Sequence, residues 1–396
     1  MTTSQSLTAP VSPDALIELD ALLDDEERQM REAVRGLVKA RIAPDIATWY
    51  EDGELPVREL AVELGELGLL GMHLTGYGCA GTSAVAYGLA CLELEAGDSG
   101  IRSLVSVQGS LAMLALHAFG SEELKEQWLP EMATGRKIGC FGLTEPDFGS
   151  DPAGMRTRAV RSGTDWIING TKMWITNGSV ADIAVVWTRP DDGIRGFAVP
   201  TDTPGFSAHT IKSKMSLRAS VTSELVLEDV RVPESARLPG ATGLRAPLSC
   251  LNEARFGIVF GAVGAARDCL ESALSYARIR KQFDRPIGGF QLTQQKLADM
   301  TLEYAKAYLL ALHLGRRKDS TGLAGPQVSL GKLNNVREAL TIARTARTIL
   351  GASGITSEYP VMRHANNLES VLTYEGTSEM HTLVIGQALT GAAAFR

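Results

Sequence analysis

The chain has 396 residues, 44% of them hydrophobic and 21% charged, which is the balance of an ordinary folded protein with two or three domains. The net charge of −7 argues against a nucleic-acid-binding protein, because such proteins normally carry a basic face. The five cysteines are scattered and form no close pair with one another or with histidine, so the sequence predicts no metal site and fits a reducing compartment.

Residues 1–24 are expected to form a flexible tail. The start, MTTSQSLTAPVSPD, is polar and broken by prolines, and it lacks the basic residues and apolar run of a signal peptide. We also find no uninterrupted apolar stretch long enough to span a membrane. The sequence therefore predicts a cytoplasmic protein that binds neither membranes nor nucleic acids.

Residues 25–137 have the pattern of a helical domain. In DDEERQMREAVRGLVKARIAP, the residues Met30, Val34 and Leu37 lie on one helical face, and the segment ends at a proline. Two more segments of the same kind, VRELAVELGELGLLG and SAVAYGLACLELEAGDSG, each end at a glycine.

Within this part, GYGCAG at residues 76–81 matches the glycine fingerprint of nicotinamide-binding folds, with Asp98 downstream as the ribose-binding acid. The fingerprint needs a preceding strand and a surrounding strand–helix–strand unit. The preceding segment has a helical pattern, and no strand-like run follows until about residue 138. We therefore expect these glycines to form a tight inter-helix loop.

The pattern changes near residue 138, where short apolar runs separated by turn residues predict a β domain over 138–245. WIINGTKMWITN places two such runs around Asn169-Gly170, a strong hairpin signal. Helical periodicity returns over 246–396, and four long amphipathic helices, the last one after Gly376, predict a bundle. We expect their apolar stripes to form the core and assign them no chemistry.

The segment LTYEGTSEMH, residues 372–381, places Glu375 between an aromatic residue and a glycine. An acid at the start of a helix complements the positive end of the helix dipole, which is the simpler explanation. The alternative is that this carboxylate is a catalytic base and that Gly376 lets a substrate approach closely. The ten residues alone favour the helix role.

Five segments of the sequence decide between the helix-start role and the catalytic role of Glu375. Together they resemble the acyl-CoA dehydrogenase family, over the whole chain after about residue 25. The resemblance implies an α+β fold with an N-terminal helical domain, a middle β-barrel-like domain and a C-terminal four-helix bundle. The segments are CFGLTEPDFGSDPAGM (140–155), MWITNGS (173–179), LNEARFG (251–257), RIRKQFDRPIGGFQLTQQKLADM (278–300) and TYEGTSEMH (373–381).

The resemblance also implies a chemistry. In the family, the glutamate of the Glu-Gly-Thr motif removes the α-proton of an acyl-CoA thioester, and FAD takes a hydride from the β-carbon, which gives a trans-enoyl-CoA. The matching base here is Glu375. Because the α-proton is weakly acidic, the enolate oxygen needs fixed donors, which the family supplies from the glutamate N–H and a flavin hydroxyl. Burial beside Tyr374 is expected to raise the pKa of Glu375.

By the same match, two sets of residues hold the FAD, and the second set implies an oligomer, typically a tetramer. Without the resemblance, Trp174 is equally consistent with a core residue, and Arg280 with a solvated helix charge. Ala352 departs from the usual second glycine of the family. The first set, around the flavin ring and thioester, is Phe141, Leu143, Thr144, Gly149, Ser150, Trp174, Ile175 and Thr176. The second set, which reaches a neighbouring subunit's FAD or follows the catalytic turn, is Arg280, Phe283, Gln291, Thr348, Gly351, Ala352 and Thr377.

One branch of the family, the glutaryl-CoA dehydrogenases, matches more closely through ELEAGDSGIRSLVSVQGSL, SLRAS and RHANNLESVLTYEGT. In that branch an arginine binds the carboxylate at the far end of the substrate, and the matching residue is Arg102. Glu95 and Ser106 are its polar neighbours. The alternative is a structural ion pair between Arg102 and Glu95 or Asp98. The remaining substrate contacts match Ser150, Tyr374, Gly376 and, at the CoA moiety, Arg255.

Oxidised glutaryl-CoA carries its carboxylate on the carbon next to the new double bond, so loss of CO2 leads to crotonyl-CoA. The resemblance therefore predicts oxidation with decarboxylation, and electron-transferring flavoprotein as the acceptor. Two departures keep a short-chain acyl-CoA dehydrogenase or oxidase open as the alternative. Ile101 stands where the branch usually has tyrosine, and Ser378-Glu379 stand where it usually has His-Asp. The presence of Glu375 argues against a non-catalytic scaffold.

Overall fold

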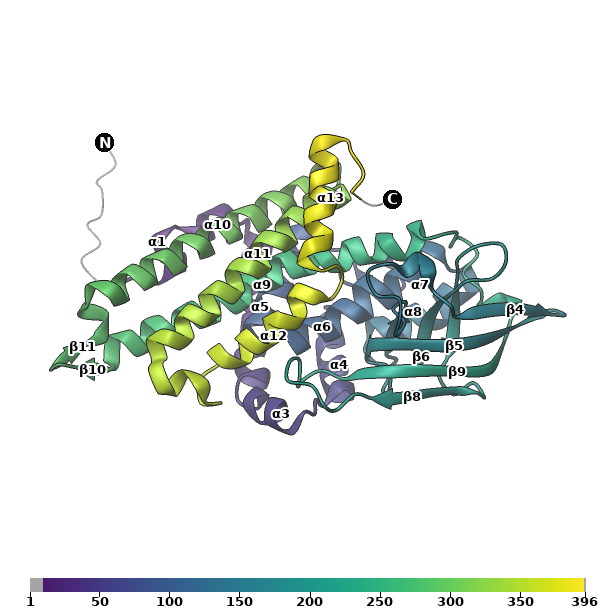
Figure 1. Cartoon of the computed structure of the whole chain (residues 1–396), viewed down its shortest axis with the longest axis horizontal. Coiled ribbons are helices and arrows are strands. Elements are labelled where there is room, and N and C mark those ends of the chain that lie inside the picture. Colours follow the sequence, from purple (N-terminus) through teal and green to yellow (C-terminus); the bar gives the residue numbers. More distant parts are fainter. Residues whose placement is uncertain (1–9, 395–396) are drawn as a thin grey trace.

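The computed structural model describes residues 10–394. The strands β4, β5, β6, β8 and β9 gather at one end of an elongated molecule, and the long C-terminal helices run away from them toward the other end, where β10 and β11 lie (Figure 1). Helices from both halves of the chain share one apolar core, which includes residues as distant as Leu19 and Val371. A second, smaller core lies among the strands. This is the helix–sheet–helix order that the sequence predicts.

The N-terminal part is helical, as predicted. Its first long helix begins with a capping box, in which Asp24 Oδ1 accepts from the Glu27 N–H at 2.9 Å and Glu27 Oε2 accepts from the Asp24 N–H at 3.0 Å. The helices are α2 (Asp25–Leu37), continued by η2 (Val38–Ile42), then α3 (Ile46–Asp52), α4 (Val57–Glu66), α5 (Ala84–Gly97), α6 (Ser99–Ser106), η3 (Val107–Met113), α7 (Leu114–Phe119) and α8 (Glu122–Ala133).

GYGCAG forms a small hairpin of β1 (Thr75–Gly76) and β2 (Cys79–Ala80) between α4 and α5. The two residues at its tip, Tyr77 and Gly78, have φ of +53° and +83°, the left-handed pair that a two-residue hairpin turn requires. Helices flank the hairpin on both sides. The prediction of a tight inter-helix loop is confirmed.

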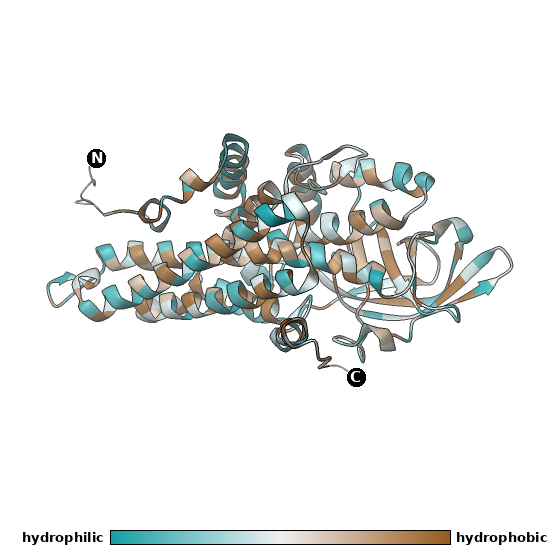
Figure 2. Cartoon of the chain, turned by 90° about the horizontal axis from the view of Figure 1, so that it is seen from above, coloured by the Kyte–Doolittle hydropathy of each residue, from teal (hydrophilic) through white to brown (hydrophobic). Residues whose placement is uncertain are grey.

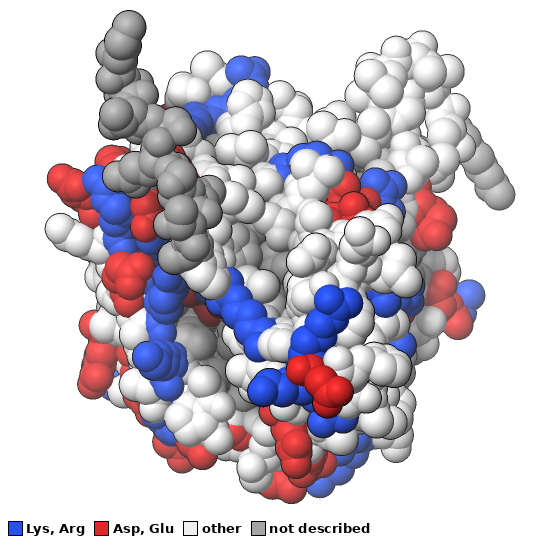
Figure 3. All heavy atoms as spheres, turned by 90° about the vertical axis from the view of Figure 1, so that its left-hand side faces the viewer, with Lys and Arg blue, Asp and Glu red and all other residues white. Residues whose placement is uncertain are grey.

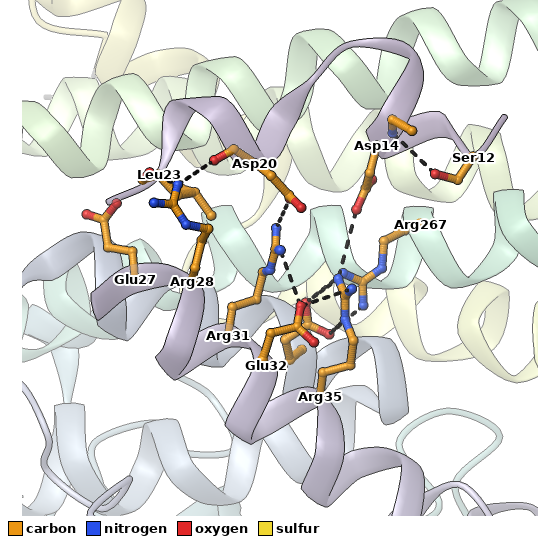
Figure 4. Close-up of polar contacts among 12 residues, drawn as sticks. Ser12, Asp14, Asp20, Leu23, Glu27, Arg28, Arg31, Glu32, Arg35 and Arg267 are labelled. Atoms are coloured by element: carbon orange, nitrogen blue, oxygen red, sulfur yellow. Dashed lines mark hydrogen bonds and ion pairs between the residues drawn. The ribbon is translucent and has the colours of Figure 1, made fainter. Parts of the chain in front are cut away.

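The expectation of a flexible tail is wrong for residues 10–24. Leu19 is fully buried against the helices, and Asp20 pairs with Arg31 at 2.7 Å, one of the contacts drawn in Figure 4. Buried leucine side chains and ion pairs offset the entropy cost of ordering the segment, and composition does not reveal them. The ordered elements are α1 (Pro13–Leu16) and η1 (Leu19–Leu22). Residues 1–9 of the predicted tail lie outside the described residues.

The run from α6 to α7, Ser99–Phe119, is 21 residues long and apolar enough to suit a membrane span by length and composition. It is not an uninterrupted apolar stretch, because Arg102 and Gln108 lie within it. Moreover, 94% of its most apolar window is buried inside the protein, which is typical of a core helix. The run carries buried polar residues as well. One of them, Gln108, accepts from the Gly139 N–H at 2.8 Å and so fixes where the strand region begins.

The middle part consists of two sheets. A three-stranded sheet has the order β3-β6-β7, with β3 and β6 parallel, and a four-stranded antiparallel sheet has the order β4-β5-β9-β8. Buried side chains from both sheets, such as Val186 and Ile168, form the second core. The strands are β3 (Gly139–Gly142), β4 (Arg158–Ser162), β5 (Asp165–Thr176), β6 (Ile183–Thr188), β7 (Arg195–Pro200), β8 (Phe206–Thr210) and β9 (Thr222–Pro233).

The predicted hairpin at Asn169-Gly170 is wrong, because β5 runs straight through these residues. A bulge lies there instead, and Gly170 has φ of +152°. Asn169 bonds across to Asp229 on β9, with Nδ2 donating to Asp229 Oδ1 at 3.0 Å and Oδ1 accepting from the Asp229 N–H at 2.8 Å. The neighbouring strand therefore holds Asn-Gly in a bulge, and the real turn lies at Gly163-Thr164.

The C-terminal part contains five helices rather than the predicted four. The unpredicted one, α12, packs along α11 and leads into Glu375, whereas α13 projects from the bundle (Figure 1). Apolar and polar positions alternate around the long helices, as amphipathic packing requires (Figure 2). The domain limits at 137/138 and 245/246 stay predictions. The elements are α9 (Arg245–Ile279), β10 (Lys281–Gln282), β11 (Arg285–Pro286), α10 (Gln291–Thr321), α11 (Gly325–Leu350), η7 (Gly351–Ile355), α12 (Val361–Thr373) and α13 (Ser378–Thr390).

Candidate active site

The loop that carries Glu375 connects α12 to α13. Glu375 has φ of +55°, a left-handed conformation that a residue with a side chain rarely adopts, and Gly376 has φ of +101°. The residue that caps α13 is Thr377, whose Oγ1 accepts from the Met380 N–H at 3.3 Å. Glu375 therefore lies outside the cap, and the simpler explanation of this glutamate as a helix-starting acid does not describe the structure.

Glu375 is half-buried, and one oxygen of its carboxylate is withdrawn from solvent. Its Oε2 atom is buried and has no hydrogen-bond partner among the described residues. Burial raises the pKa of Glu375 above its ordinary value of 4.5, and the nearby cations Arg102, Lys332 and Arg255 oppose that rise. A buried carboxylate with a free oxygen and a raised pKa has the properties that a general base needs.

Arg102 reaches this loop from α6. Its Nε donates to Glu95 Oε2 at 2.7 Å, and one terminal nitrogen donates to the hydroxyl of Tyr374, the residue before Glu375. Its other terminal nitrogen, Nη1, is buried and has no partner within residues 10–394, and the same is true of the hydroxyl of Ser106, one helical turn along on the same face. The ion pair with Glu95 therefore orients Arg102 and leaves part of its guanidinium free.

Asp98, the other acid considered as a partner of Arg102, bonds elsewhere. Its Oδ2 accepts from Arg363 Nε at 3.0 Å and from Asn367 Nδ2 at 2.8 Å, both on α12. Asn367 in turn accepts from the Leu217 N–H at 2.8 Å. The three segments that resemble the glutaryl-CoA branch thus meet around one carboxylate, which ties α6 and α12 to the loop before β9.

Two more cations hold the backbone of the loop. Arg255 on α9 donates from Nε to the Glu375 carbonyl at 2.6 Å. Lys332 on α11 donates from Nζ to the Tyr374 carbonyl at 2.5 Å and to the Gly376 carbonyl at 2.7 Å. The assignment of Arg255 to the CoA moiety stays a prediction, since the structure gives it this loop contact. Sequence reasoning missed Lys332, although a lysine on the buried face of an amphipathic helix was the available signal.

The loop also depends on small residues. A Cβ added at Gly376 would lie 3.0 Å from His381 Nε2, so that side of the residue is closed. A Cβ at Gly261 on α9 would lie 2.0 Å from Glu95 Oε2, so this glycine makes room for the Glu95–Arg102 pair. Glu95 and Arg102 thus have their space reserved by Gly261, a residue that the sequence did not single out.

The first predicted FAD set lies together around the ends of β3 and β5. Glu145 and Lys172 pair at 2.9 Å in the interior and fix the loop that follows β3. Thr144 accepts from the Met173 N–H at 2.9 Å, which brings the two segments side by side. The members of the set differ in exposure. The buried ones are Phe141, Leu143 and Ile175, the half-buried ones are Thr144 and Thr176, and the exposed ones are Gly149, Ser150 and Trp174.

The exposed surface of this set fits a flat aromatic group. Trp174 is 60% exposed at φ of +64°, so it is not the core tryptophan that was the alternative. A Cβ added at Gly149 would meet no atom within 4 Å, so open space lies above that loop. An exposed indole beside open backbone suits stacking against a flavin. The contact of each residue with FAD stays a prediction.

The second predicted FAD set lies at the opposite end of the molecule, around the β10–β11 hairpin and η7 (Figure 1). The end view in Figure 3 shows Lys and Arg side chains gathered there. Phe283 is 89% exposed, and Ala352 has no positive φ, so its replacement of glycine brings no backbone strain. One chain does not bring the two sets together. Thr377, the remaining member, lies in the loop that carries Glu375. All the members at this end are exposed, namely Arg280, Phe283, Gln291, Thr348, Gly351 and Ala352.

Comparison with known proteins gives matches along the whole chain. Family models match consecutive parts: the acyl-CoA dehydrogenase N-terminal domain over residues 24–136, the middle domain over 140–230 and the C-terminal domain over 241–390. A probable acyl-CoA dehydrogenase of Bacillus subtilis (strain 168) is 38% identical over 377 residues, which are 93% of this chain and 98% of that protein.

Two solved structures are more similar. The crystal structure of glutaryl-CoA dehydrogenase from Mycobacterium smegmatis is 81% identical, with a TM-score of 0.97, and the match covers 98% of this chain and 100% of that one. A second glutaryl-CoA dehydrogenase structure from Mycobacterium smegmatis, in complex with FADH2, is 66% identical with the same TM-score and coverage.

Proposed function

The chain belongs to the acyl-CoA dehydrogenase family of FAD-dependent enzymes, and from this premise we propose that it oxidises glutaryl-CoA and releases CO2 to give crotonyl-CoA. The observation that carries the proposal is the state of Arg102. Its guanidinium is fully buried and bonds the residue next to Glu375, and one of its nitrogens has no partner among the described residues, as is also the case for the Ser106 hydroxyl one helical turn along. A buried cation with free donors suits a substrate that brings its own carboxylate.

Each end of such a substrate has a group to receive it. Arg102 and Ser106 bind the terminal carboxylate, and Glu95 holds the guanidinium in orientation. The carboxylate of Glu375 accepts the α-proton, and burial excludes the water that would compete for it. FAD, when it is bound by the first predicted FAD set, which includes Trp174, would accept the β-hydrogen together with its electron pair as a hydride.

The length of the substrate's acyl chain then determines whether CO2 is lost. After oxidation, the terminal carboxylate sits on the carbon next to the double bond, so breaking that C–C bond leaves its electron pair in a delocalised dienolate. Protonated Glu375 is placed to return the proton it took, which gives crotonyl-CoA. A dicarboxylyl thioester one carbon longer has no such route, so its oxidation releases no CO2.

The alternative is a short-chain acyl-CoA dehydrogenase or oxidase. Ile101, which stands where the glutaryl-CoA branch usually has tyrosine, is fully buried in the core. Steady-state kcat/KM for glutaryl-, butyryl- and adipyl-CoA, measured with an artificial electron acceptor, separates the two functions. Preference for glutaryl-CoA with one CO2 per turnover supports the proposal. Preference for butyryl-CoA, or oxygen consumption without the acceptor, supports the alternative.

The same proposal extends to the assembly and its setting. A homotetramer, in which a neighbouring copy brings Arg280 and Phe283 to each FAD, would unite the two sets that one chain keeps apart. Electron-transferring flavoprotein is the proposed acceptor, and the cytoplasm the proposed compartment. Phe283→Ala should then lower FAD retention although Phe283 lies far from Trp174 in the same chain. Unchanged FAD retention in a protein that sediments as a monomer would contradict this.

A further inference from the structure

Three consecutive carbonyls of the loop that carries Glu375 are each held by a basic side chain, either the half-buried Arg255 or the buried Lys332. The middle one, on Glu375, accepts from Arg255 at 2.6 Å. The two outer ones, on Tyr374 and Gly376, both accept from the single ammonium of Lys332, at 2.5 and 2.7 Å. Lys332 is 1% exposed. A lysine buried so completely, and bonded to main-chain oxygens rather than to a carboxylate, is uncommon and calls for a function.

The contact with the Tyr374 carbonyl also sets the direction of a donor. In a trans peptide, the C=O of one residue and the N–H of the next lie in one plane and point in opposite directions. No cis peptide occurs in the described residues. Holding the Tyr374 carbonyl toward α11 therefore points the Glu375 N–H away from α11. No acceptor for that N–H is found within the part of the chain that the structure describes.

The second contact spans the strained residue. Glu375 keeps φ of +55°, which a non-glycine residue adopts at a cost, and the surrounding structure has to hold it there. Lys332 bonds the carbonyl before Glu375 and the carbonyl after it. The Tyr374 carbonyl lies in the peptide plane before Glu375, and the Glu375 carbonyl, which Arg255 holds, lies in the plane after it. Lys332 therefore fixes the plane that carries the Glu375 N–H, and its bond to the Gly376 carbonyl fixes the chain where it leaves the turn.

We propose that Lys332 is a positioning residue, which holds the Glu375 N–H toward the thioester oxygen while the Glu375 carboxylate faces the α-carbon. The proposal rests on the acyl-CoA dehydrogenation described above. Lysine suits the task because an ammonium is a compact group with three donors on a flexible stem, able to reach two carbonyls at once. The other charged side chains around it are Arg102, Arg255 and Glu375, with the Tyr374 ring 5.7 Å away.

The test compares FAD-loaded wild type with Lys332→Met, which keeps the stem and removes every donor. Arg337→Met, an exposed position on the same helix, is the control. We expect kcat to fall about 10²-fold, the cost of one misplaced oxyanion donor, with KM and FAD content close to wild type. Butyryl-CoA serves as a second substrate, because removal of the α-proton is common to both thioesters. Failure on glutaryl-CoA alone, in wild type, therefore counts against the proposed substrate and not against Lys332.

A spectroscopic readout separates positioning from stability. A 3-oxoacyl-CoA ionises to an enolate with its own ultraviolet absorbance, and an oriented N–H lowers the pH at which the bound ligand ionises. Lys332→Met should raise that pH, and Lys332→Gln, which keeps one short donor, should raise it less. If Lys332→Met does not fold, the comparison of Lys332→Gln with wild type is decisive. Unchanged kcat and an unchanged ionisation of the bound ligand in a folded variant would overturn the proposal.

Discussion

The guanidinium of Arg102 donates to the hydroxyl of Tyr374, the residue directly before Glu375. The two residues are 272 positions apart in the sequence and come from α6 and the α12–α13 loop. Because of this contact, the group that we propose to bind the far end of the substrate is bonded to the residue next to the proposed base. We therefore expect substrate length and proton removal to be coupled in this site, and the coupling can be tested from either end.

Replacement of Arg102 by glutamine should affect substrates unequally. Truncating one member of a buried, hydrogen-bonded charge pair costs about 2–5 kcal/mol, so kcat/KM for glutaryl-CoA should fall about 30- to 5,000-fold. Butyryl-CoA has no carboxylate and should lose far less. The double variant Glu95→Gln/Arg102→Gln removes the buried charge left behind and should show the same selectivity. An equal loss on both substrates would mean that Arg102 has a structural role only.

Glu375→Gln should lower kcat about 10²- to 10⁴-fold on every acyl-CoA, since the amide cannot accept a proton. FAD should still bind, because all the predicted flavin residues except Thr377 lie on other segments. Glu379→Gln, an exposed glutamate at the start of α13, is the matched control and should keep wild-type kcat. The rate of anaerobic flavin reduction, followed by absorbance, measures the effect on the chemical step. A Glu375→Gln variant with near wild-type reduction would remove this residue as the base.

The pH dependence follows from the raised pKa of Glu375. The residue must be ionised to act as a base, so kcat/KM should fall as the pH decreases through that raised pKa, which lies above 4.5. Arg102 favours the ionised form. In Arg102→Gln, the acid limb measured with butyryl-CoA should therefore move to higher pH. A limb that stays in place, or moves down, would show that Arg102 does not act on this carboxylate.

Trp174→Ala should weaken FAD retention, because a large exposed ring would no longer stack on the isoalloxazine. Trp174→Phe keeps an aromatic face and should retain most of the flavin. The ratio of flavin to protein absorbance after extensive dialysis gives the comparison. Trp187→Phe, fully buried between the strands and the helices, tests packing alone and should retain its flavin. Equal flavin content in Trp174→Ala and wild type would show that the isoalloxazine ring does not depend on stacking against Trp174.

Leu19→Ala should destabilise the protein although it lies in the segment expected to be a flexible tail. Leu19 is fully buried, and Leu→Ala changes in cores cost about 2–5 kcal/mol. Leu22, in the same turn, is 42% exposed, and Leu22→Ala should change stability little. Thermal unfolding of both FAD-loaded variants measures the difference. Identical Tm values for the two would mean that the segment contributes nothing to the core.

Sequence reasoning reached the helix–sheet–helix order because helical periodicity and short strand-like runs are local signals. The roles of Glu375 and Arg102 came from motifs shared with the family, and they stay predictions. Sequence reasoning failed where a distant partner decides the outcome. Asn169-Gly170 has the chemistry of a turn, yet Asp229 on the neighbouring strand holds it in a bulge. The sequence does not distinguish Lys332 from other positions on a long helix, because its two partners, the carbonyls of Tyr374 and Gly376, are distant in the sequence.

The measurement that tests the central claim most directly is an anaerobic addition of glutaryl-CoA to the FAD-loaded protein. The flavin absorbance is followed, and the thioester that remains is identified by mass. Bleaching of the flavin with formation of crotonyl-CoA is the predicted result, because it requires both proton removal at Glu375 and loss of the carboxylate held by Arg102. A flavin that stays oxidised, or a five-carbon enoyl-CoA that keeps its carboxylate, would contradict the account.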